Sequence, residues 1–198
     1  MGIDLTSFAR SKNRNLPSVE VLIIVMILSA DFILISVFIE NWATVAAAWV
    51  LSLGLITASW IDVRTHRIPR NLSYTTFAVG FPLLVIAAFV EDDMSRVVNS
   101  VIGAVVATAL IGFLYLIGRG AMGGGDVRLA PVIGLYTGWI SMQTVLVALV
   151  ASFFLAAIFA LILLVLGRAK RSDDLPLGPF LAWGTLVVFV YSAAKAGL

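Results

Sequence analysis

The amino-acid sequence predicts an all-α fold, a polytopic integral membrane helical bundle of about seven spans. The first observation is composition: hydrophobic residues make up 61% of the 198-residue chain and charged residues only 12%, whereas a soluble domain is about half apolar and a quarter charged. The second is that the apolar residues come in runs of roughly 20, the length that crosses a bilayer as a helix. Lipid cannot satisfy backbone hydrogen bonds, so these runs are expected to be helices.

Polar residues separate the expected spans, which are residues 21–39, 42–61, 72–90, 97–118, 126–140, 145–166 and 177–194. A polar tail, residues 1–18, precedes the first span. That span is longer than a typical signal core and shows no clear small-residue cleavage site before Glu40, so we expect an uncleaved helix. The second span begins at Trp42, which we expect to anchor it at the membrane interface. The third lies between a basic loop and an acidic one.

The later spans differ in length and character. The fourth carries small residues typical of close helix packing, namely Gly103, Ala104, Ala107, Ala109 and Gly112. The fifth is the shortest, because Ser141 soon follows it, and it is either a short crossing or a re-entrant helix. Trp139 near its end is a second expected interfacial anchor. The sixth is a long apolar run, and the seventh begins at a turn that contains two prolines and a glycine.

Basic residues gather on one side of this arrangement. With seven crossings and a cytoplasmic N-terminus, 11 of the 13 Lys and Arg residues fall in the cytoplasm, as the positive-inside rule expects. Only Arg96 and Lys195 fall outside, on the side that holds the acidic residues 91–93. If the fifth segment did not cross, the basic group at Arg168 would also fall outside, so the pattern favours a crossing. We expect one membrane-embedded domain, residues 19–198.

The composition also bears on ligands. The chain has no cysteine, so it has no disulfide, no thiolate zinc site and no cysteine nucleophile. Its net charge of +2 suggests no nucleic-acid surface. The single histidine, His66, lies in a basic loop where too few further ligands are visible for a metal site. We therefore expect neither a metal nor a cofactor.

Three carboxylates lie in or beside the apolar runs, where an ionisable side chain is costly and needs a partner or a function. Asp31 lies in the middle of the first span, and we expect a structural role for it. Asp62 ends the second span and Asp126 begins the fifth, so both lie at the cytoplasmic ends of their helices. Two carboxylates at one depth are what aspartyl hydrolysis requires, since one takes a proton from water while the other gives one to the substrate carbonyl.

A plainer interpretation makes each aspartate an interfacial anchor paired with a local arginine, Arg64 or Arg128. The three glycines at 123–125 favour catalysis, because they let an extended substrate backbone approach the carboxylate closely. Helix direction then suggests roles, since a helix N-terminus favours the charged form of Asp126 and a C-terminus the protonated form of Asp62. Asp126 is the predicted base and Asp62 the predicted acid.

Three motifs in order along the chain together resemble the type IV prepilin peptidases, a family of G-x-G-D aspartyl proteases. The motifs are Asp62 followed by Ile68, Pro69, Asn71 and Leu72; Gly123, Gly124, Gly125 and Asp126 followed by Arg128 and Leu129; and Pro176, Leu177, Gly178, Pro179 and Phe180. The similarity covers roughly residue 49 to the C-terminus. The family core of six helices would take up residues 42–198, and the first span is an addition to it.

The resemblance implies a membrane endopeptidase that cleaves the short basic leader peptide from prepilins at the cytoplasmic face of the bacterial inner membrane, with Asp62 and Asp126 as the catalytic pair. The expected substrate contacts are Gly123, Gly124, Gly125, Pro176, Gly178 and Pro179. The partners would be a prepilin or pseudopilin, the pilus assembly machinery and the lipid bilayer. Larger members also carry a cysteine-rich zinc-binding region and N-methylate the new pilin terminus. Without cysteine, this chain resembles the short form of tight-adherence (Flp) pili, and methyltransferase activity is not expected.

Three other interpretations compete with this one. A presenilin-like protease also uses G-x-G-D, but it should place its aspartates deeper in the bilayer and carry a Pro-Ala-Leu motif. A small transporter would use Asp31, Asp62 and Asp126 as a proton or cation relay, with carboxylates stepped across the bilayer and inverted repeats. A non-catalytic pilus assembly factor has no evident need for both site aspartates.

Overall fold

Residues 18–39, 41–118, 122–167 and 176–197 are described by the computed structural model. These ranges contain seven α-helices and no strand, which confirms the all-α prediction. The helices are α2 (Ser18–Phe38), α3 (Trp42–Thr65), α4 (Arg70–Val90), α5 (Ser95–Ile117), α6 (Gly124–Ile140), α7 (Met142–Val165) and α8 (Gly178–Ala196). The tail at 1–17, Glu40 and the basic residues Arg119, Arg168, Lys170 and Arg171 lie outside the described residues.

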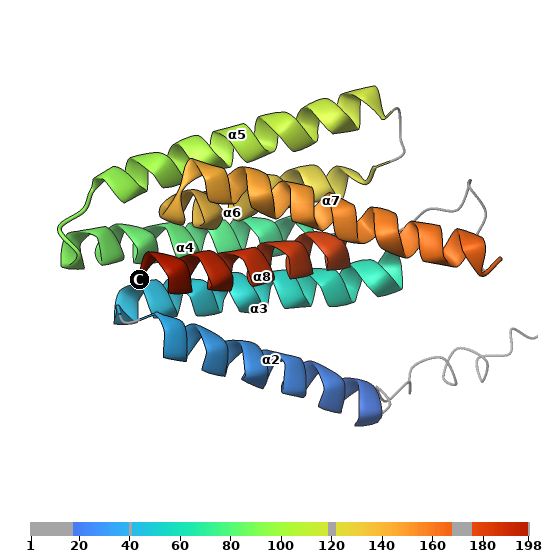
Figure 1. Ribbon diagram of the computed structural model, residues 1–198, viewed down its shortest axis with the longest axis horizontal. Helices are drawn as coiled ribbons and strands as arrows, with labels where there is room; N and C mark the ends of the chain where they lie inside the picture. Colours follow the sequence, from blue (N-terminus) through green and yellow to red (C-terminus); the bar gives the residue numbers. More distant parts are fainter. Residues whose placement is uncertain (1–17, 40, 119–121, 168–175, 198) are drawn as a thin grey trace, which may run out of the picture.

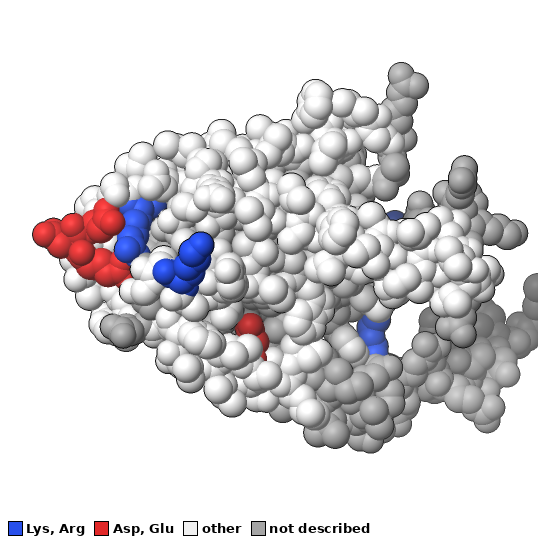
Figure 2. All heavy atoms as spheres, viewed as in Figure 1, with Lys and Arg blue, Asp and Glu red and all other residues white. Residues whose placement is uncertain are grey.

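Consecutive helices run antiparallel along one long axis (Figure 1). Five of those described, α3, α4, α5, α7 and α8, are long and apolar enough to cross a membrane. We call one end of the bundle the Arg70 end, where α3 ends and α4 begins, and the other the Glu91 end, where α4 ends. Figure 2 shows acidic side chains gathered at one end of the molecule and an almost uncharged middle.

Helix α6 is the interior helix of the bundle. It has 17 residues, so its length is about 25 Å, less than the hydrocarbon thickness of a bilayer. It lies between α5, α7, α4 and α8 (Figure 1), and Leu129, Ile133, Tyr136 and Trp139 on it are all fully or almost fully buried. Ser141 caps both the end of α6 and the start of α7 at the Glu91 end. The fifth segment therefore connects the Arg70 end of the bundle to the Glu91 end, as a short crossing would.

Glycines bring α5 and α6 into close contact. A Cβ at Gly134 would overlap the backbone of Gly103, and a Cβ at Gly138 would lie 2.7 Å from the carbonyl oxygen of Asn99. The predicted small-residue face of α5 is confirmed at Gly103, Ala104 and Ala107, which are buried. It ends there, because Ala109 is exposed and a Cβ at Gly112 would meet no atom within 4 Å.

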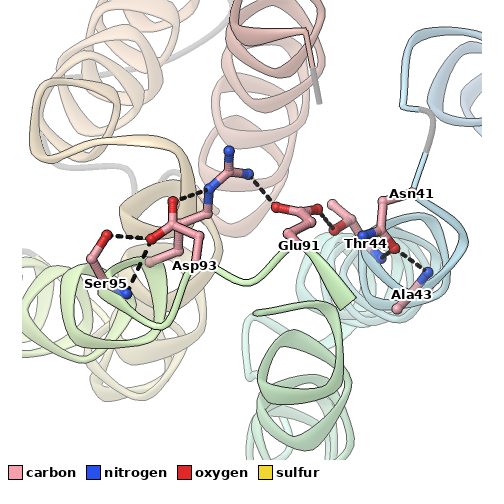
Figure 3. Close-up of polar contacts among 7 residues, drawn as sticks. Asn41, Ala43, Thr44, Glu91, Asp93 and Ser95 are labelled. Carbon is pink, nitrogen blue, oxygen red and sulfur yellow. Dashed lines mark hydrogen bonds and ion pairs between the residues drawn. The ribbon is translucent and has the colours of Figure 1, made fainter. Parts of the chain in front are cut away.

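Polar contacts organise the Glu91 end (Figure 3). Asn41 caps α3 by accepting a hydrogen bond from the backbone N–H of Ala43 at 2.8 Å. The hydroxyl of Thr44 on α3 donates to Glu91 Oε1 at 3.1 Å. Arg96 on α5 contacts the other oxygen of Glu91 at 2.6 Å and Asp93 Oδ2 at 3.1 Å. Charged side chains thus join α3, the α4–α5 turn and α5.

Trp139 corrects one expectation. The indole is fully buried, and the guanidinium carbon of Arg96 lies 5.6 Å from its ring centroid, within the range of a cation–π contact. Because α6 is interior, a tryptophan at its end packs inside the protein and does not anchor it in the interface. Trp42 has 64% of its surface exposed, as an anchor at the start of α3 should.

Candidate active site

Asp62 belongs to the last turn of α3. The helix continues four residues past the expected end and stops at Thr65, where His66 adopts a left-handed conformation with φ of 51°. The His66 N–H donates to the carbonyl oxygen of Asp62 at 2.8 Å and closes the helix. The Asp62 side chain is 6% exposed. Asp62 is therefore held on a rigid element and covered by its neighbours, not placed on the following loop.

Asp126 lies in the first turn of α6. That helix begins at Gly124, two residues earlier than expected, with Gly123 as its N-cap. The backbone N–H of Asp126 donates to the carbonyl oxygen of Gly123 at 3.1 Å, and the residue is 4% exposed. Ile68, in the loop that follows α3, packs against Gly125 beside Asp126, so α3 and α6 bring two buried aspartates to the Arg70 end.

The N-terminus of α8 covers Asp62. The Gly178 N–H donates to Asp62 Oδ2 at 2.9 Å, a buried contact between residues 116 positions apart. A Cβ at Gly178 would lie 2.7 Å from that oxygen, so only glycine allows the backbone to approach so closely. Pro179 stands in the first turn of α8, where a missing N–H costs nothing. Pro176 is half-buried and precedes the helix.

The three glycines before Asp126 have different surroundings. A Cβ at Gly125 would lie 2.9 Å from Cβ of Ile68, so this glycine lets the α3–α4 loop pack on α6. A Cβ at Gly123 would lie 3.3 Å from Asp126 Oδ2. Beside Gly124 the nearest atom, a hydroxyl oxygen, would be 4.0 Å away. Of the three glycines, Gly124 has the most open surroundings. The assignment of all three to substrate binding stays a prediction.

From the sequence we predicted no packing role for Ile68, which the structure places at the site. It is 5% exposed, and it lies against Gly125 between the two aspartate-bearing segments. The signal was present, since Ile68 is the one large apolar residue in a loop of arginines, a histidine and a proline. An isolated apolar residue in such a loop indicates a contact with the rest of the protein.

The basic loop contributes charge at the site but no ligand cluster. The Arg64 guanidinium lies over the ring of Trp60, 4.1 Å from its centroid, a cation–π geometry. His66 is exposed. Within the described part of the chain, no three His, Asp or Glu side chains come together as metal ligands would.

The α8 contact changes the electrostatic comparison of the two aspartates. Asp126 lies at the N-terminus of its own helix, and Asp62 lies against the N-terminus of α8. Both carboxyls therefore face the positive end of a helix dipole. The prediction that Asp126 is the base and Asp62 the acid considered only the helix that carries each residue. Asp62 lies at the negative end of α3 and against the positive end of α8, whose effects on its charge oppose each other, so the roles stay a prediction.

The fold and the site define a class: a polytopic helical membrane protein with two buried aspartates at one end of the bundle. Residues 49–161 match the type IV leader peptidase family, and this range includes both aspartates. Since the match covers more than half of the chain, the chain belongs to that family.

Several relatives carry the name prepilin leader peptidase/N-methyltransferase. The protein of Aeromonas salmonicida (strain A449) is 29% identical over 147 residues, 72% of this chain and 47% of the relative. That of Burkholderia pseudomallei (strain K96243) is 30% identical over 70% of this chain and 44% of the relative. That of Pectobacterium carotovorum subsp. carotovorum is 26% identical over 85% and 57%. The chain thus spans about half the length of the relatives it matches, and no solved structure matches it.

Proposed function

We propose that this protein is a membrane aspartyl endopeptidase that removes the leader peptide from prepilins. The observation that carries the proposal is that two different helices bring the buried Asp62 and Asp126 to the same end of the bundle. Membership of the leader peptidase family supports the same reaction. Buried carboxyls without a function are rare in membrane helices, because each one costs free energy.

The chemistry divides between the two carboxyl groups. Two interacting carboxyls share one proton, so one is a base and the other an acid at the same pH. The charged carboxylate takes a proton from water, whose oxygen attacks the scissile carbonyl carbon. The protonated carboxyl gives its proton to the carbonyl oxygen. When the tetrahedral intermediate collapses, the C–N bond breaks, the carboxyl that had taken the proton from water gives it to the leaving amine, and the other carboxylate recovers its proton from a hydroxyl of the intermediate.

The absence of cysteine from the sequence supports assignment to the short form that serves tight-adherence (Flp) pili, without N-methyltransferase activity. We place the protein in the bacterial inner membrane as one membrane-embedded domain, residues 19–198, with the Arg70 end on the cytoplasmic side. The basic residues of the α3–α4 loop support that orientation. The prepilin leader and the pilus assembly machinery would then meet the protein at that end.

Cleavage of a co-expressed prepilin tests the proposal. Asp62→Asn and Asp126→Asn should each lower the cleavage rate in membranes by at least about 100-fold, because each removes one proton transfer. Asp92→Asn is the matched control, since Asp92 is exposed at the Glu91 end and its φ of 52° suits asparagine. A site variant that is folded and still cleaves at the native rate would exclude the two-aspartate mechanism.

A further inference from the structure

A groove on the lipid-facing side of the bundle is not explained by the catalytic site. It lies between α2 and α8, has a volume of about 630 Å³, and is lined by apolar side chains that include Leu34, Trp183 and Val187. These three are 46%, 47% and 59% exposed. In Figure 2 the middle of the molecule is almost uncharged, with one small acidic spot. We call the groove between these two helices the α2–α8 groove.

The groove continues towards the active site. A second cavity of about 260 Å³ shares Ile27, Ile56, Trp183 and Leu186 with it, and is also lined by Val63 and Ala182. Val63 directly follows Asp62 in the sequence. Ala182 lies one helical turn beyond Gly178, the residue that contacts Asp62. The two cavities therefore extend from the middle of α2 to Val63 and Ala182, close in the sequence to Asp62 and to its contact Gly178.

The two cavities have one carboxyl group among their lining residues. Asp31 borders the α2–α8 groove, and its Oδ2 is shielded from solvent without a hydrogen-bond partner among the described residues. An unsatisfied carboxyl oxygen at this depth is costly. A hydrogen-bond donor on a molecule bound in the groove would pair with Asp31 Oδ2 and offset this free-energy cost.

We propose that the α2–α8 groove holds the apolar membrane helix of the protein substrate, with Asp31 hydrogen-bonded to a polar side chain on that helix. The inference rests on the proposed function and deepens it. Three features point to a substrate helix: the lining is mostly apolar, the groove continues towards the end of α3 that carries Asp62, and Asp31 offers a carboxyl oxygen without a hydrogen-bond partner among the described residues. An acyl chain has no donor for Asp31, and the residues before α2 are too polar to fill such a surface.

The geometry fixes where the polar partner should lie. Ile27 and Ile56 border both cavities, so they mark one level of the bundle. Asp31 lies four residues beyond that level on α2, and Asp62 lies six residues beyond it on α3 in the opposite direction. At about 1.5 Å per residue the two are separated by about 15 Å along the axis, so the partner should lie about 10 residues after the cleaved bond.

Disulfide crosslinking in membranes tests the groove, because the chain has no cysteine of its own. Leu34→Cys places a thiol in the groove. Val105→Cys is the control, since Val105 is 63% exposed on α5 and lines neither of the two cavities. The partner is a co-expressed prepilin with single cysteines scanned through the apolar segment after the cut. Both variants carry Asp126→Asn so that the substrate stays uncleaved.

The expected result is crosslinking from Leu34→Cys that recurs about every 3.6 substrate residues, as on a helix face, and none above background from Val105→Cys. Equal crosslinking at both positions, or crosslinking only to a second copy of this protein, overturns the proposal. An absence of substrate crosslinks also overturns the proposal and would indicate that lipid occupies the groove. If the native chain cleaves no prepilin but the crosslinks form, the proposed function fails and the docking site stands.

Kinetics of Asp31 variants give a second readout. Asp31→Leu should raise KM for full-length prepilin about five- to tenfold and leave cleavage of a short peptide across the cut unchanged. Asp31→Asn, which keeps a hydrogen-bonding group, should be close to the native protein. Since Asp31 Oδ2 has no hydrogen-bond partner among the described residues, we expect thermal unfolding of Asp31→Leu to match that of the native protein, so that a change in KM reports substrate binding. An unchanged KM in Asp31→Leu rules Asp31 out as a substrate contact.

Discussion

At the scale of single residues, the site depends on Gly178, because a residue with a side chain would not fit at this position. Gly178 brings its N–H to Asp62 only because no Cβ intervenes. The contact orients the carboxyl and positions the start of α8 over it. Gly178 is therefore a positioning residue in the proposed reaction, and Asp62 is the group that acts on substrate.

Gly178→Ala should abolish cleavage while the protein stays folded. The new Cβ would lie 2.7 Å from Asp62 Oδ2, so either the carboxyl or α8 must move, and a displacement near 1 Å costs about 100-fold in rate. Prepilin cleavage and thermal unfolding in detergent measure the two effects. Gly112→Ala, at a position with open space, is the control. Native cleavage by Gly178→Ala would show that the contact is not needed.

At the opposite end of the bundle, we expect the ion pair of Arg96 with Glu91 to stabilise the fold. The Arg96 side chain is 27% exposed and that of its partner Glu91 17%. Arg96→Met should lower the free energy of unfolding by about 1–3 kcal/mol, because Glu91 keeps its charge without its cation. Denaturant titration in micelles measures the loss. In the Glu91→Gln background the same change should cost less, and equal costs would show that the ion pair contributes nothing.

The acidic turn also makes that end sensitive to low pH. A hydrogen bond from the Ser95 hydroxyl, with further contacts from Arg96, holds the pKa of Asp93 below its ordinary value of 3.8. A lowered pKa in the folded state means that these contacts stabilise the turn above pH 3.8 and are lost as the pH falls through the lower value. Ser95→Ala should move the Asp93 pKa back up, as measured by NMR titration of the carboxyl. An unmoved pKa would exclude the hydroxyl as its main cause.

At the scale of elements, α6 is a helix of the bundle interior with few side chains at the outer surface. Its neighbours bury it almost completely, so it needs neither the length nor the hydropathy of a lipid-facing span. Its first turn carries Asp126, and its glycines set the spacing to α5. A rigid, buried helix holds a catalytic carboxyl more exactly in place than a loop does.

Gly134→Ala tests that packing. Its Cβ would overlap the backbone of Gly103 on α5, and backbone cannot move aside as a side chain can, so the free energy of unfolding should fall by at least about 1–3 kcal/mol. Thermal unfolding in detergent gives the measurement. Gly112→Ala on α5 should leave stability unchanged or slightly raised, since a Cβ there meets no atom. Equal stabilities of the two variants would contradict close α5–α6 packing.

At the scale of the whole molecule, the two ends differ in charge. Arg64, Arg67 and Arg70 belong to the Arg70 end, and Glu91, Asp92 and Asp93 to the opposite end. Seven antiparallel helices separate them (Figure 1). The positive-inside rule then favours a cytoplasmic active site.

Cysteine labelling decides the orientation. Arg67→Cys and Met94→Cys place single exposed thiols at the two ends of a chain that has no other cysteine. A maleimide that cannot cross the inner membrane should label Met94→Cys in intact cells and leave Arg67→Cys unlabelled. Both should react after permeabilisation. The reverse pattern would place the active site outside and exclude cleavage at the cytoplasmic face.

The sequence by itself determined the helices, because each depends on its own run of apolar residues. Every helix lies within four residues of its expected bounds, and a backbone in lipid has few other ways to satisfy its hydrogen bonds. The sequence also singled out Asp62 and Asp126, since a carboxyl beside an apolar run is costly enough to stand out. The sequence also favoured a crossing by α6, because the distribution of Lys and Arg along the whole chain fits seven spans better than six.

Only the tertiary structure decided which residues meet across the bundle. Gly178 contacts Asp62 from 116 positions away, Ile68 packs on Gly125, and Trp139 lies beneath Arg96. No local pattern encodes such contacts, because they depend on the order and rotation of packed helices. The same holds for helix dipoles, because the sequence placed Asp62 at the negative end of α3, and only the packing showed that the positive end of α8 also lies against it. The elements are local in origin, whereas the surroundings of each carboxyl come from the packing.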